Sequence, residues 1–500
     1  MTGGGTAART KALTHSDADW EGLRVVVAGL GLSGFAAADA LVQRGARVVA
    51  LDAREGAAEQ EKADVLRVLD ADVRLGADAT TSLPDVEGSP PDVVVTSPGW
   101  RPDAPLLAGA LSSGIDVWGE VELAWRLRPP TGATPWLTLT GTNGKTTAVR
   151  MLAAILAAAG LRTAAVGNVG TPLLHAIVDP VPHDVLAVEL SSFQLHWSTS
   201  IAPRASACLN VAPDHVDWHG SLGAYAAAKA RVYTGTEVAC VYNVEDPATE
   251  QMVREADVVD GCRAIGFTLG VPDLSMLGVV DDVLCDRAFV AERTTSAAEL
   301  ATLADLEAAA GGTVAAHTVA NALAAAALAR AHGVPPVAVR DGLRGVVPEP
   351  HRITRVADHG GVTWIDDSKA TNPHAASASL AAFEAVVWVA GGLAKGARFD
   401  DLVATHAGRL RAVVLVGVDR SPLRDALARH APDVPVVEVS PPDTGAVMSA
   451  AVGAAAELAR PGDTVLLAPA CASMDQFTSY ATRGDAFADA VRAHVSSGAG

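Results

Sequence analysis

The chain has 500 residues, about the length of three domains, and 49% of them are hydrophobic, which is enough for several cores. A formal net charge of −19 argues against a nucleic-acid or anionic-membrane surface, and no uninterrupted apolar run approaches the roughly 18 residues of a membrane span. Five cysteines without C-x-x-C spacing indicate buried thiols in a reducing compartment, so we expect a cytoplasmic protein that binds no nucleic acid and inserts into no membrane.

Strand-like apolar runs alternate with Ala- and Leu-rich helical runs, a pattern typical of α/β layers around parallel sheets. Residues 1–19 are small and polar, lack the apolar segment of a signal peptide, and are expected to form a disordered tail. Pro-containing stretches at 128–132 and 348–350 then divide the chain into blocks at 20–128, 129–347 and 348–500.

Each block contains expected strands. They are 24–28, 47–51 and 92–96 in the first block, 185–190, 205–211 and 238–243 in the second, and 362–366, 385–390, 412–418, 435–439 and 464–468 in the third. A helical run at 314–332 ends the second block, whereas the weakly patterned segment 268–312 is either β-rich or irregular.

A Gly-rich turn follows the first expected strand. Residues 29–34 read G-x-G-x-x-G between a strand and a helix, and Asp52 ends the next strand, where an acidic residue holds a ribose in dinucleotide sites. The pattern indicates either an NAD-binding oxidoreductase or a Rossmann-like site for another nucleotide. Ser97 follows a further strand and either contacts the same diphosphate or forms a simple turn.

A second Gly-rich turn, residues 141–147, lies between an apolar strand and the helical run 148–159. Its backbone N–H groups can converge on a phosphate, Lys145 adds a positive charge, Thr146 can ligate Mg²⁺, and the helix contributes its dipole. Leu139 stands where a strict P-loop has glycine, and a turn that merely caps a helix is the alternative. A dehydrogenase has no use for this second turn. A synthetase with a nucleotide-linked substrate uses both Gly-rich turns, 29–34 and 141–147.

Polar residues follow other strands of the second block. Glu189 ends a strand where a magnesium ligand is expected, and Asp214, His215 and Asp217 cluster after another, although capping and structural roles are the alternatives. Lys229 lies in a helical run, where a lysine ordinarily faces solvent. Residues 243–246 mimic the N-K-x-D base reader of GTPases but lack its lysine, which leaves a GTPase as a further alternative.

Taken together, these residues resemble the Mur ligase family, the ATP-dependent amide-forming enzymes of peptidoglycan assembly. The match is carried by ordered motifs over nearly the whole chain, at 140–146, 167–170, 189–194, 210–215, Lys229, 317–321, 351–352 and 367–372. Residues 469–477 and 483–484, with the first Gly-rich turn and Ser97, favour the branch that adds D-glutamate to UDP-N-acetylmuramoyl-L-alanine through an acyl phosphate. The Asp-Asn-Pro-Arg motif of the diaminopimelate- and lysine-adding relatives does not occur in the last block. A family member with another amino-acid specificity is the alternative.

The resemblance implies an α/β fold of three domains in the three blocks: a Rossmann-like UDP-binding domain, a P-loop-type ATPase domain, and a Rossmann-like domain that binds the amino acid. It implies ATP and Mg²⁺ at two sites as cofactors, UDP-N-acetylmuramoyl-L-alanine and D-glutamate as substrates, and a monomer. Two departures stand out. Lys395 follows Leu393-Ala394, where the family often has an acidic neighbour, and Tyr480 stands where Phe is more usual.

The resemblance also implies residue roles. The residues expected to contact the UDP substrate are Leu32, Ser33, Asp52, Arg54, Ser97, Asn168 and Ser191. Those expected to bind ATP are Gly141, Thr142, Asn143, Gly144, Lys145, Thr146, Thr147, Asn321, Arg352 and Asp367. Thr146 and Glu189 would hold one Mg²⁺, and His215 and a carbamylated Lys229 the other, so that Lys145, Lys229 and His215 are the catalytic candidates. The expected D-glutamate pocket is Lys369, Thr371, Lys395, Ser473, Met474 and Tyr480.

Overall fold

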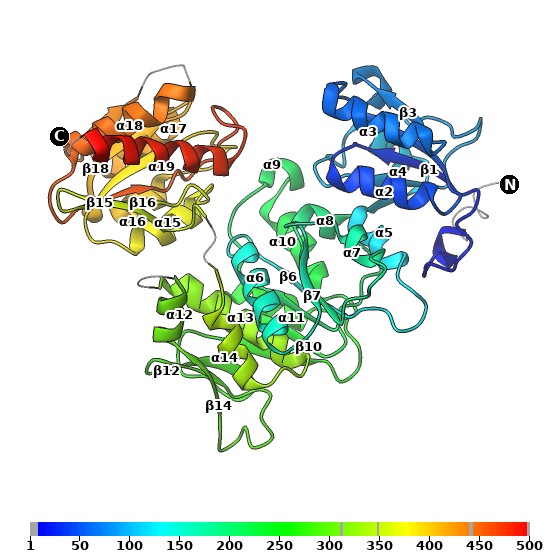
Figure 1. Ribbon diagram of the computed structural model, residues 1–500, viewed down its shortest axis with the longest axis horizontal. Coiled ribbons are helices and arrows are strands. Elements are labelled where there is room, and N and C mark those ends of the chain that lie inside the picture. The colour runs from blue at the N-terminus through cyan, green and yellow to red at the C-terminus, as the bar shows by residue number, and fades with distance from the viewer. Residues whose placement is uncertain (1–8, 311–313, 348–349, 440–443, 498–500) are drawn as a thin grey trace. The chain divides into compact units, whose positions relative to one another are not determined.

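The computed structural model describes residues 9–310, 314–347, 350–439 and 444–497. Within them the strands form three sheets, one in each expected block (Figure 1). By their contacts the residues group into two compact units, 1–211 with 222–346, and 212–221 with 347–500. The first unit contains the first two sheets. The expected boundary at 348–350 falls partly on residues 348 and 349, which lie outside the described residues.

The first sheet is parallel, in the order β3-β2-β1-β4-β5. Its strands are β1 (Arg24–Ala28), β2 (Arg47–Asp52), β3 (Asp72–Leu75), β4 (Val93–Thr96) and β5 (Asp116–Gly119). Its helices are α2 (Leu32–Val42), α3 (Ala57–Val68), α4 (Pro105–Ser112) and α5 (Glu120–Arg126). The three expected strands are confirmed. The edge strands β3 and β5 were not expected, because each has only four residues and begins with an aspartate.

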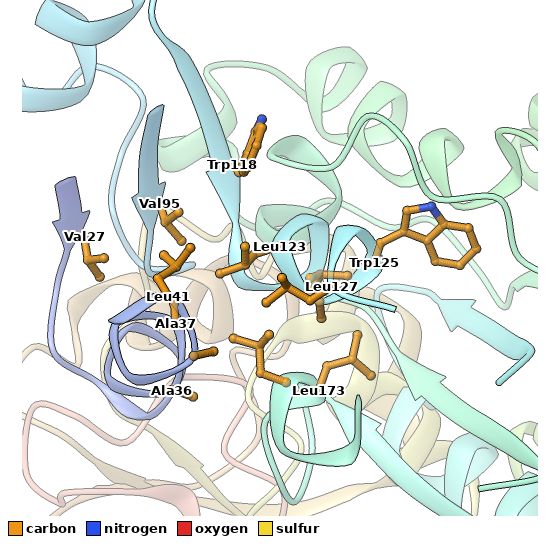
Figure 2. Close-up of a cluster of buried hydrophobic side chains, with 14 of the residues drawn as sticks. Val27, Ala36, Ala37, Leu41, Val95, Trp118, Leu123, Trp125, Leu127 and Leu173 are labelled. Carbon is orange, nitrogen blue, oxygen red and sulfur yellow. The ribbon is translucent and has the colours of Figure 1, made fainter. Parts of the chain in front are cut away.

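Alternate residues of the first sheet enter two hydrophobic clusters on its two faces. Figure 2 shows one of them, in which Val27 and Val95 lie with Leu41 of α2 and Leu123 of α5. Leu173, the first residue of α7 (Leu173–Ile177) in the second block, belongs to the same cluster. A continuous core therefore joins the first two blocks, which explains why they form one compact unit.

The expected disordered tail does not extend over residues 9–19, and residues 1–8 lie outside the described part of the chain. Leu13 is 1% exposed and belongs to the core of Figure 2. The Thr10 hydroxyl donates to Asp116 Oδ2 at 2.7 Å, and the Arg126 guanidinium donates to the carbonyls of Thr10 and Leu13. A single buried leucine among polar residues gave no periodic signal that would have indicated this packing.

The second sheet has nine strands in the order β14-β13-β12-β11-β10-β9-β6-β8-β7. They are β6 (Trp136–Thr140), β7 (Thr163–Gly167), β8 (Val185–Glu189), β9 (Ala205–Cys208), β10 (Ala239–Asn243), β11 (Arg263–Phe267), β12 (Met276–Val280), β13 (Val283–Asp286) and β14 (Ala298–Thr302). Its helices are α6 (Lys145–Ala158), α7 (Leu173–Ile177), α8 (Ser192–His196), α10 (Leu222–Ala230), α11 (Pro247–Arg254), α12 (Leu303–Ala310), α13 (Ala316–Ala331) and α14 (Pro336–Arg344). Strand β13 pairs antiparallel with both β12 and β14. The β-rich interpretation of 268–312 is therefore confirmed up to the start of α12.

The third sheet has the order β15-β16-β20-β17-β18-β19, with β15 antiparallel to its neighbour. Its strands are β15 (Thr354–His359), β16 (Val362–Asp366), β17 (Val386–Gly391), β18 (Leu410–Val416), β19 (Val436–Glu438) and β20 (Thr464–Leu467). One hydrophobic cluster packs α15 (Pro373–Ala381), α16 (Asp400–His406) and α17 (Ser421–His430) on one face, and another packs α18 (Thr444–Leu458) and α19 (Tyr480–Ser497) on the other (Figure 1). All five expected strands are confirmed, and β15 was missed. No helix in the described ranges is long and apolar enough to span a membrane.

A buried carboxyl group connects the first two blocks. Glu120 is 1% exposed at the start of α5, and its Oε1 accepts a hydrogen bond from Leu174 N in α7 at 2.8 Å. Burial raises the pKa of Glu120 from 4.5 to about 7. The folded protein therefore holds this proton at pH values where the unfolded chain releases it, so stability from this group is complete below pH 4.5 and is lost as the pH rises through about 7.

We expect Glu120→Gln to remove this part of the pH dependence. Between pH 5 and pH 8, the unfolding free energy of the unchanged protein should fall by about 3 kcal/mol more than that of the variant. Urea unfolding at four pH values measures the difference, and Glu61→Gln, an exposed position on α3, is the matched control. Equal pH dependence in the protein and in Glu120→Gln would show that Glu120 is already ionised in the fold.

Candidate active site

The Gly-rich turn 141–144 joins the carboxyl end of β6 to the first residue of α6. Gly144 has φ +83°, a left-handed conformation that side chains disfavour, and a Cβ there would lie 2.3 Å from Asn321 Oδ1 of α13. Position 144 therefore requires glycine for two reasons. Asn321 lies beside this turn, hereafter the phosphate loop, as expected from the sequence. Asn321 Nδ2 is buried and has no hydrogen-bond partner among the described residues.

Asn210, two residues after the end of β9, holds this loop in place. Its Oδ1 accepts from Asn143 N at 2.9 Å, its Nδ2 donates to Asn143 O at 3.2 Å, and its carbonyl accepts from Thr142 N at 3.0 Å. The Thr142 and Tyr225 hydroxyls form a further hydrogen bond of 3.0 Å. The expected residue roles did not include these contacts of Asn210 and Tyr225. The available signal was the position of Asn210 at the end of a neighbouring strand.

Two lysines direct their ammonium groups at the carbonyls of the loop. Lys145 Nζ donates to the carbonyls of Gly141 and Thr142, both at 2.9 Å, and Lys229 Nζ donates to Gly141 O at 2.7 Å. Lys229 is 1% exposed, with its Nζ 4.6 Å from the ring centroid of Tyr225. The ordinary solvated-helix interpretation of Lys229 is therefore wrong, and two positive charges lie where a polyphosphate is expected.

Glu189 ends β8, whose register places it opposite Leu139 of β6, just before the loop. It is 1% exposed, and its Oε1 accepts from Asn168 Nδ2 at 2.8 Å. Glu189 Oε2 is buried and has no hydrogen-bond partner in the described parts of the chain. The Ser191 hydroxyl, two residues later, accepts from Gln194 N in the cap of α8.

These groups fit one Mg²⁺ ion. Magnesium binds through one or two carboxylates together with water and substrate phosphates, and Glu189 offers a buried carboxylate oxygen while Thr146 offers a hydroxyl at the start of α6. The described residues contain no group of three or more His, Cys, Asp or Glu side chains that could hold a metal by itself. A second ion therefore needs a further oxygen ligand, which an unmodified Lys229 ammonium does not supply.

The Gly-rich turn of the first sheet is closely packed and held by a side-chain hydrogen bond. A Cβ on Gly34 would lie 1.7 Å from Gly29 O, and Ser97 Oγ donates to the same carbonyl at 3.0 Å. Ser97 therefore does more than form a simple turn. Leu32, at the start of α2, is 71% exposed and followed by Ser33, so this face of the turn is open to a ligand.

Asp52 stabilises the same turn, and its carboxylate accepts hydrogen bonds from the backbone of the turn and from Arg54. Its Oδ2 accepts from Leu30 N at 2.7 Å, its Oδ1 accepts from Arg54 N at 2.9 Å, and the Arg54 guanidinium donates to both oxygens. Burial by itself would raise the pKa of Asp52, but the hydrogen bonds from Arg54 and Leu30 outweigh it and hold the pKa below its usual range. This buried, bonded carboxylate argues against the ribose contact of an NAD site.

In the second unit, Asp366 ends β16 and Asp367 follows it. His351 Nδ1 lies 2.6 Å from Asp366 Oδ2, and Asp367 accepts hydrogen bonds from the Ser379 hydroxyl and from Ile353 N. Burial raises the pKa of Asp367 to about 6, against the opposing effects of the Ser379 hydrogen bond and the Arg352 charge. The structure thus brings Arg352 and Asp367 together.

The buried Arg483 connects segments that carry residues expected to bind the amino acid. Its guanidinium donates to Ser368 Oγ, to Ser368 O and to Cys471 O, and Ser368 Oγ donates to Tyr480 O. Lys369 Nζ lies 5.5 Å from the ring centroid of Tyr480.

Backbone hydrogen bonds add the other segments of this pocket. Leu393 N donates to Ala472 O, which places the segment of Lys395 beside that of Ser473, and Thr371 N donates to Lys369 O. Ser473 is buried, whereas Met474 is 64% exposed. All six residues expected for D-glutamate therefore belong to neighbouring segments of one unit.

His215 and the GTPase-like motif at 243–246 are two further candidates from the sequence. His215 belongs to the second unit, whereas Lys145, Glu189 and Lys229 belong to the first. His215 has φ +51° and its Nε2 lies 3.7 Å from Asp214 Oδ2. Asp246 caps α11 by accepting from Ala248 N, and it also accepts from Val211 N, so the GTPase-like motif at 243–246 is part of a helix cap.

Comparisons with known proteins cover most of the chain. A model described as the Mur ligase MurD-like N-terminal domain matches residues 23–119, the Mur ligase middle domain matches 139–329, and the Mur ligase glutamate ligase domain matches 351–471. UDP-N-acetylmuramoylalanine–D-glutamate ligase of Streptomyces avermitilis is 60% identical over 474 residues, which cover 95% of this chain and 99% of the relative. The enzyme of the same name from Mycolicibacterium smegmatis is 46% identical, with coverage of 95% and 97%.

Solved structures share the fold at low sequence identity. MurF from Acinetobacter baumannii matches with a TM-score of 0.55 at 17% identity, covering 94% of this chain and 90% of that one. The UDP-N-acetylmuramate-alanine ligase MurC from Thermotoga maritima matches with a TM-score of 0.52 at 18% identity, covering 94% and 99%. The expected three-domain α/β architecture is thereby confirmed.

Proposed function

The chain belongs to the Mur ligase family, and we propose that it is the member that uses ATP to add D-glutamate to UDP-N-acetylmuramoyl-L-alanine. The observation that carries this assignment is 60% identity over 95% of the chain with a relative named for that reaction. The MurD-like model over 23–119 favours the same branch over ligases for other amino acids. The product is a precursor of peptidoglycan.

Each block receives one substrate in this proposal. Residues 20–128 bind the UDP moiety, 129–347 bind ATP, and 348–500 bind D-glutamate; the three matched ranges support these boundaries. Because one chain carries all three sites, we propose that it acts as a monomer. Five free cysteines support a cytoplasmic location.

The phosphate loop is the proposed ATP site, and the contacts of Lys145, Lys229 and Asn210 support it. Thr146 and Glu189 would hold one Mg²⁺, and His215 and a carbamate on Lys229 would hold the second. Bound Mg²⁺ supplies positive charge to the phosphates, which is most of what phosphoryl transfer requires of a protein. Asn321, Arg352 and Asp367 contact the nucleotide, and Asn168 and Ser191 contact the UDP-linked substrate.

The chemistry has two steps. A carboxylate oxygen of UDP-N-acetylmuramoyl-L-alanine attacks the γ-phosphorus of ATP, the bond to the β-phosphate oxygen breaks, and an acyl phosphate and ADP form. The amine of D-glutamate then attacks the acyl carbon, and the C–O bond breaks as phosphate leaves. Lys145 stabilises the negative charge of the transferring phosphoryl group. Exclusion of water prevents hydrolysis of the acyl phosphate.

An oxygen-labelling experiment tests this sequence of bonds. If the carboxylate of the UDP-linked substrate carries ¹⁸O, one labelled oxygen should leave in the inorganic phosphate, because that oxygen attacked the γ-phosphorus. Mass spectrometry of the released phosphate measures the label. Unlabelled phosphate would indicate that water, not the substrate carboxylate, attacks ATP.

In the proposed D-glutamate pocket, Lys369 and Lys395 face the two carboxylates of the amino acid. We expect Lys369→Ala or Lys395→Ala to raise the KM for D-glutamate by about 10-fold or more and to change the KM for ATP much less, because a hydrogen bond to a charged group contributes roughly 1.5–3 kcal/mol. Steady-state kinetics with each substrate varied in turn measures both constants. Arg398→Ala, whose side chain is 90% exposed, is the control for a lost positive charge. Equal effects on both KM values would contradict this assignment.

A further inference from the structure

Two thiols of the second sheet lie in contact, away from the proposed active site. Cys240 is in β10 and Cys262 directly precedes β11, and their Sγ atoms are 3.7 Å apart. The parallel register pairs Cys240 with Ala264, so Cys262 and Cys240 lie on the same face of the sheet. Both side chains belong to the same hydrophobic cluster.

The two thiols differ in their surroundings. Cys240 is 2% exposed, and Ser206 Oγ lies 4.0 Å from its Sγ, whereas Cys262 is half-buried and accessible from outside. The hydrogen bond between the two thiols, together with burial, raises the pKa of Cys240, and the same hydrogen bond lowers the pKa of Cys262. The more exposed sulfur is therefore also the one that more readily becomes a thiolate, the nucleophilic form.

We propose that Cys240 and Cys262 form a peroxide-reactive dithiol in which Cys262 is oxidised first and Cys240 then closes a disulfide. The Cys262 thiolate attacks one oxygen of hydrogen peroxide, the O–O bond breaks, and the departing hydroxide takes up a proton to give water. Cys262 is then a sulfenic acid. The sulfur of Cys240 attacks Cys262 Sγ, the S–O bond breaks, and a second water leaves with the thiol proton. Two thiols have lost two electrons, and one peroxide has become two waters.

The location of the pair predicts what oxidation does to the enzyme. Cys240 and Cys262 lie near the amino ends of β10 and β11, whereas the phosphate loop follows the carboxyl end of β6, and β6, β9 and β10 are parallel. The disulfide therefore forms at the end of the sheet opposite the ATP site. It closes the segment that contains α11, so we expect the oxidised protein to keep its turnover and to unfold at a higher temperature.

The full-length protein is treated with hydrogen peroxide, quenched with a thiol-alkylating reagent, and digested for peptide mass spectrometry. The expected product is a cross-linked peptide pair containing Cys240 and Cys262, lighter by two hydrogens than the two thiol peptides and separated again by a reducing agent. In Cys240→Ser the sulfenic acid on Cys262 should persist and react with a dimedone probe. Cys285 is the internal control, because it is also half-buried but its sulfur donates to the backbone carbonyl of Val283.

Several outcomes would overturn the proposal. One is oxidation of Cys262 no faster than that of Cys285, and another is peroxide treatment that leaves Cys240 and Cys262 alkylated as separate thiols. Dimedone labelling of Cys262 that is equally strong with and without Cys240 would remove the resolving role of Cys240. The first two readouts use the unaltered protein, so a variant that fails to fold leaves the test intact.

Discussion

Replacing Lys145 by Ala is expected to lower kcat by about 10³-fold, which is the loss typical of removing one preorganised charge or donor from the site of a developing negative charge. Lys145 begins α6 and directs its Nζ at the carbonyls of Gly141 and Thr142, so its charge lies within the phosphate loop itself. In the proposed reaction that charge stabilises the transferring phosphoryl group. Release of ADP from ATP in the presence of both other substrates measures the effect.

Two controls separate this electrostatic role from folding. Arg150→Ala removes an exposed positive charge from the same helix and should leave kcat nearly unchanged. Thermal unfolding of Lys145→Ala shows whether the loss of its two hydrogen bonds destabilises the first unit. A Lys145→Ala protein that is folded and keeps near-normal turnover would contradict the proposed phosphoryl-transfer mechanism.

Replacing Lys229 by Ala is expected to lower kcat by at least about 10²-fold, because the proposed carbamate on its amine supplies oxygen ligands that Mg²⁺ prefers. An amine that adds CO₂ and releases a proton becomes an anion with two oxygens. Lys229 is nearly fully buried, and its Nζ already reaches the carbonyl of Gly141, so the modified group would lie at the phosphate loop. ADP formation at saturating Mg²⁺ measures the loss.

Lys229→Gln is the matched variant, because its side-chain amide can still donate to a carbonyl but cannot add CO₂. If Lys229 only anchors the loop, Lys229→Gln should recover most of the activity that Lys229→Ala loses. If the carbamate is needed, both variants should be equally impaired. The unaltered protein should then also lose activity in CO₂-depleted buffer and regain it with bicarbonate, and activity that is indifferent to CO₂ would count against the carbamate.

Local sequence determined much of the fold and part of the candidate site. Glu189 and Lys145 were predictable because each lies at a strand end or turn whose flanking pattern is visible within about ten residues. Eleven expected strands are present; most of their apolar runs are buried inside the sheets, whereas β19 is an exposed edge strand. The edge strands β3, β5 and β15 were missed, since sheet edges tolerate the charged residues that mask a strand pattern, and β7 and β11 were also not expected.

Roles that arise from tertiary packing were not visible in the sequence. Nothing around Lys229 distinguishes it from a solvated helix residue, and its burial follows from packing of α10 beside the phosphate loop. The contacts between Asn210 and Asn143 join residues 67 positions apart. Asp52 occurs where a ribose-binding acid is expected, yet its carboxylate accepts a hydrogen bond from Leu30 N, 22 positions earlier in the chain.

The most direct test of the account is phosphate release from ATP and Mg²⁺ with UDP-N-acetylmuramoyl-L-alanine, compared across D-glutamate, L-glutamate, L-alanine and diaminopimelate. The account predicts release with D-glutamate and none above background with the other three. Release with another amino acid in place of D-glutamate would retain the ligase chemistry but contradict the proposed pocket around Lys369 and Lys395. No release with any of the four would contradict the proposed function itself.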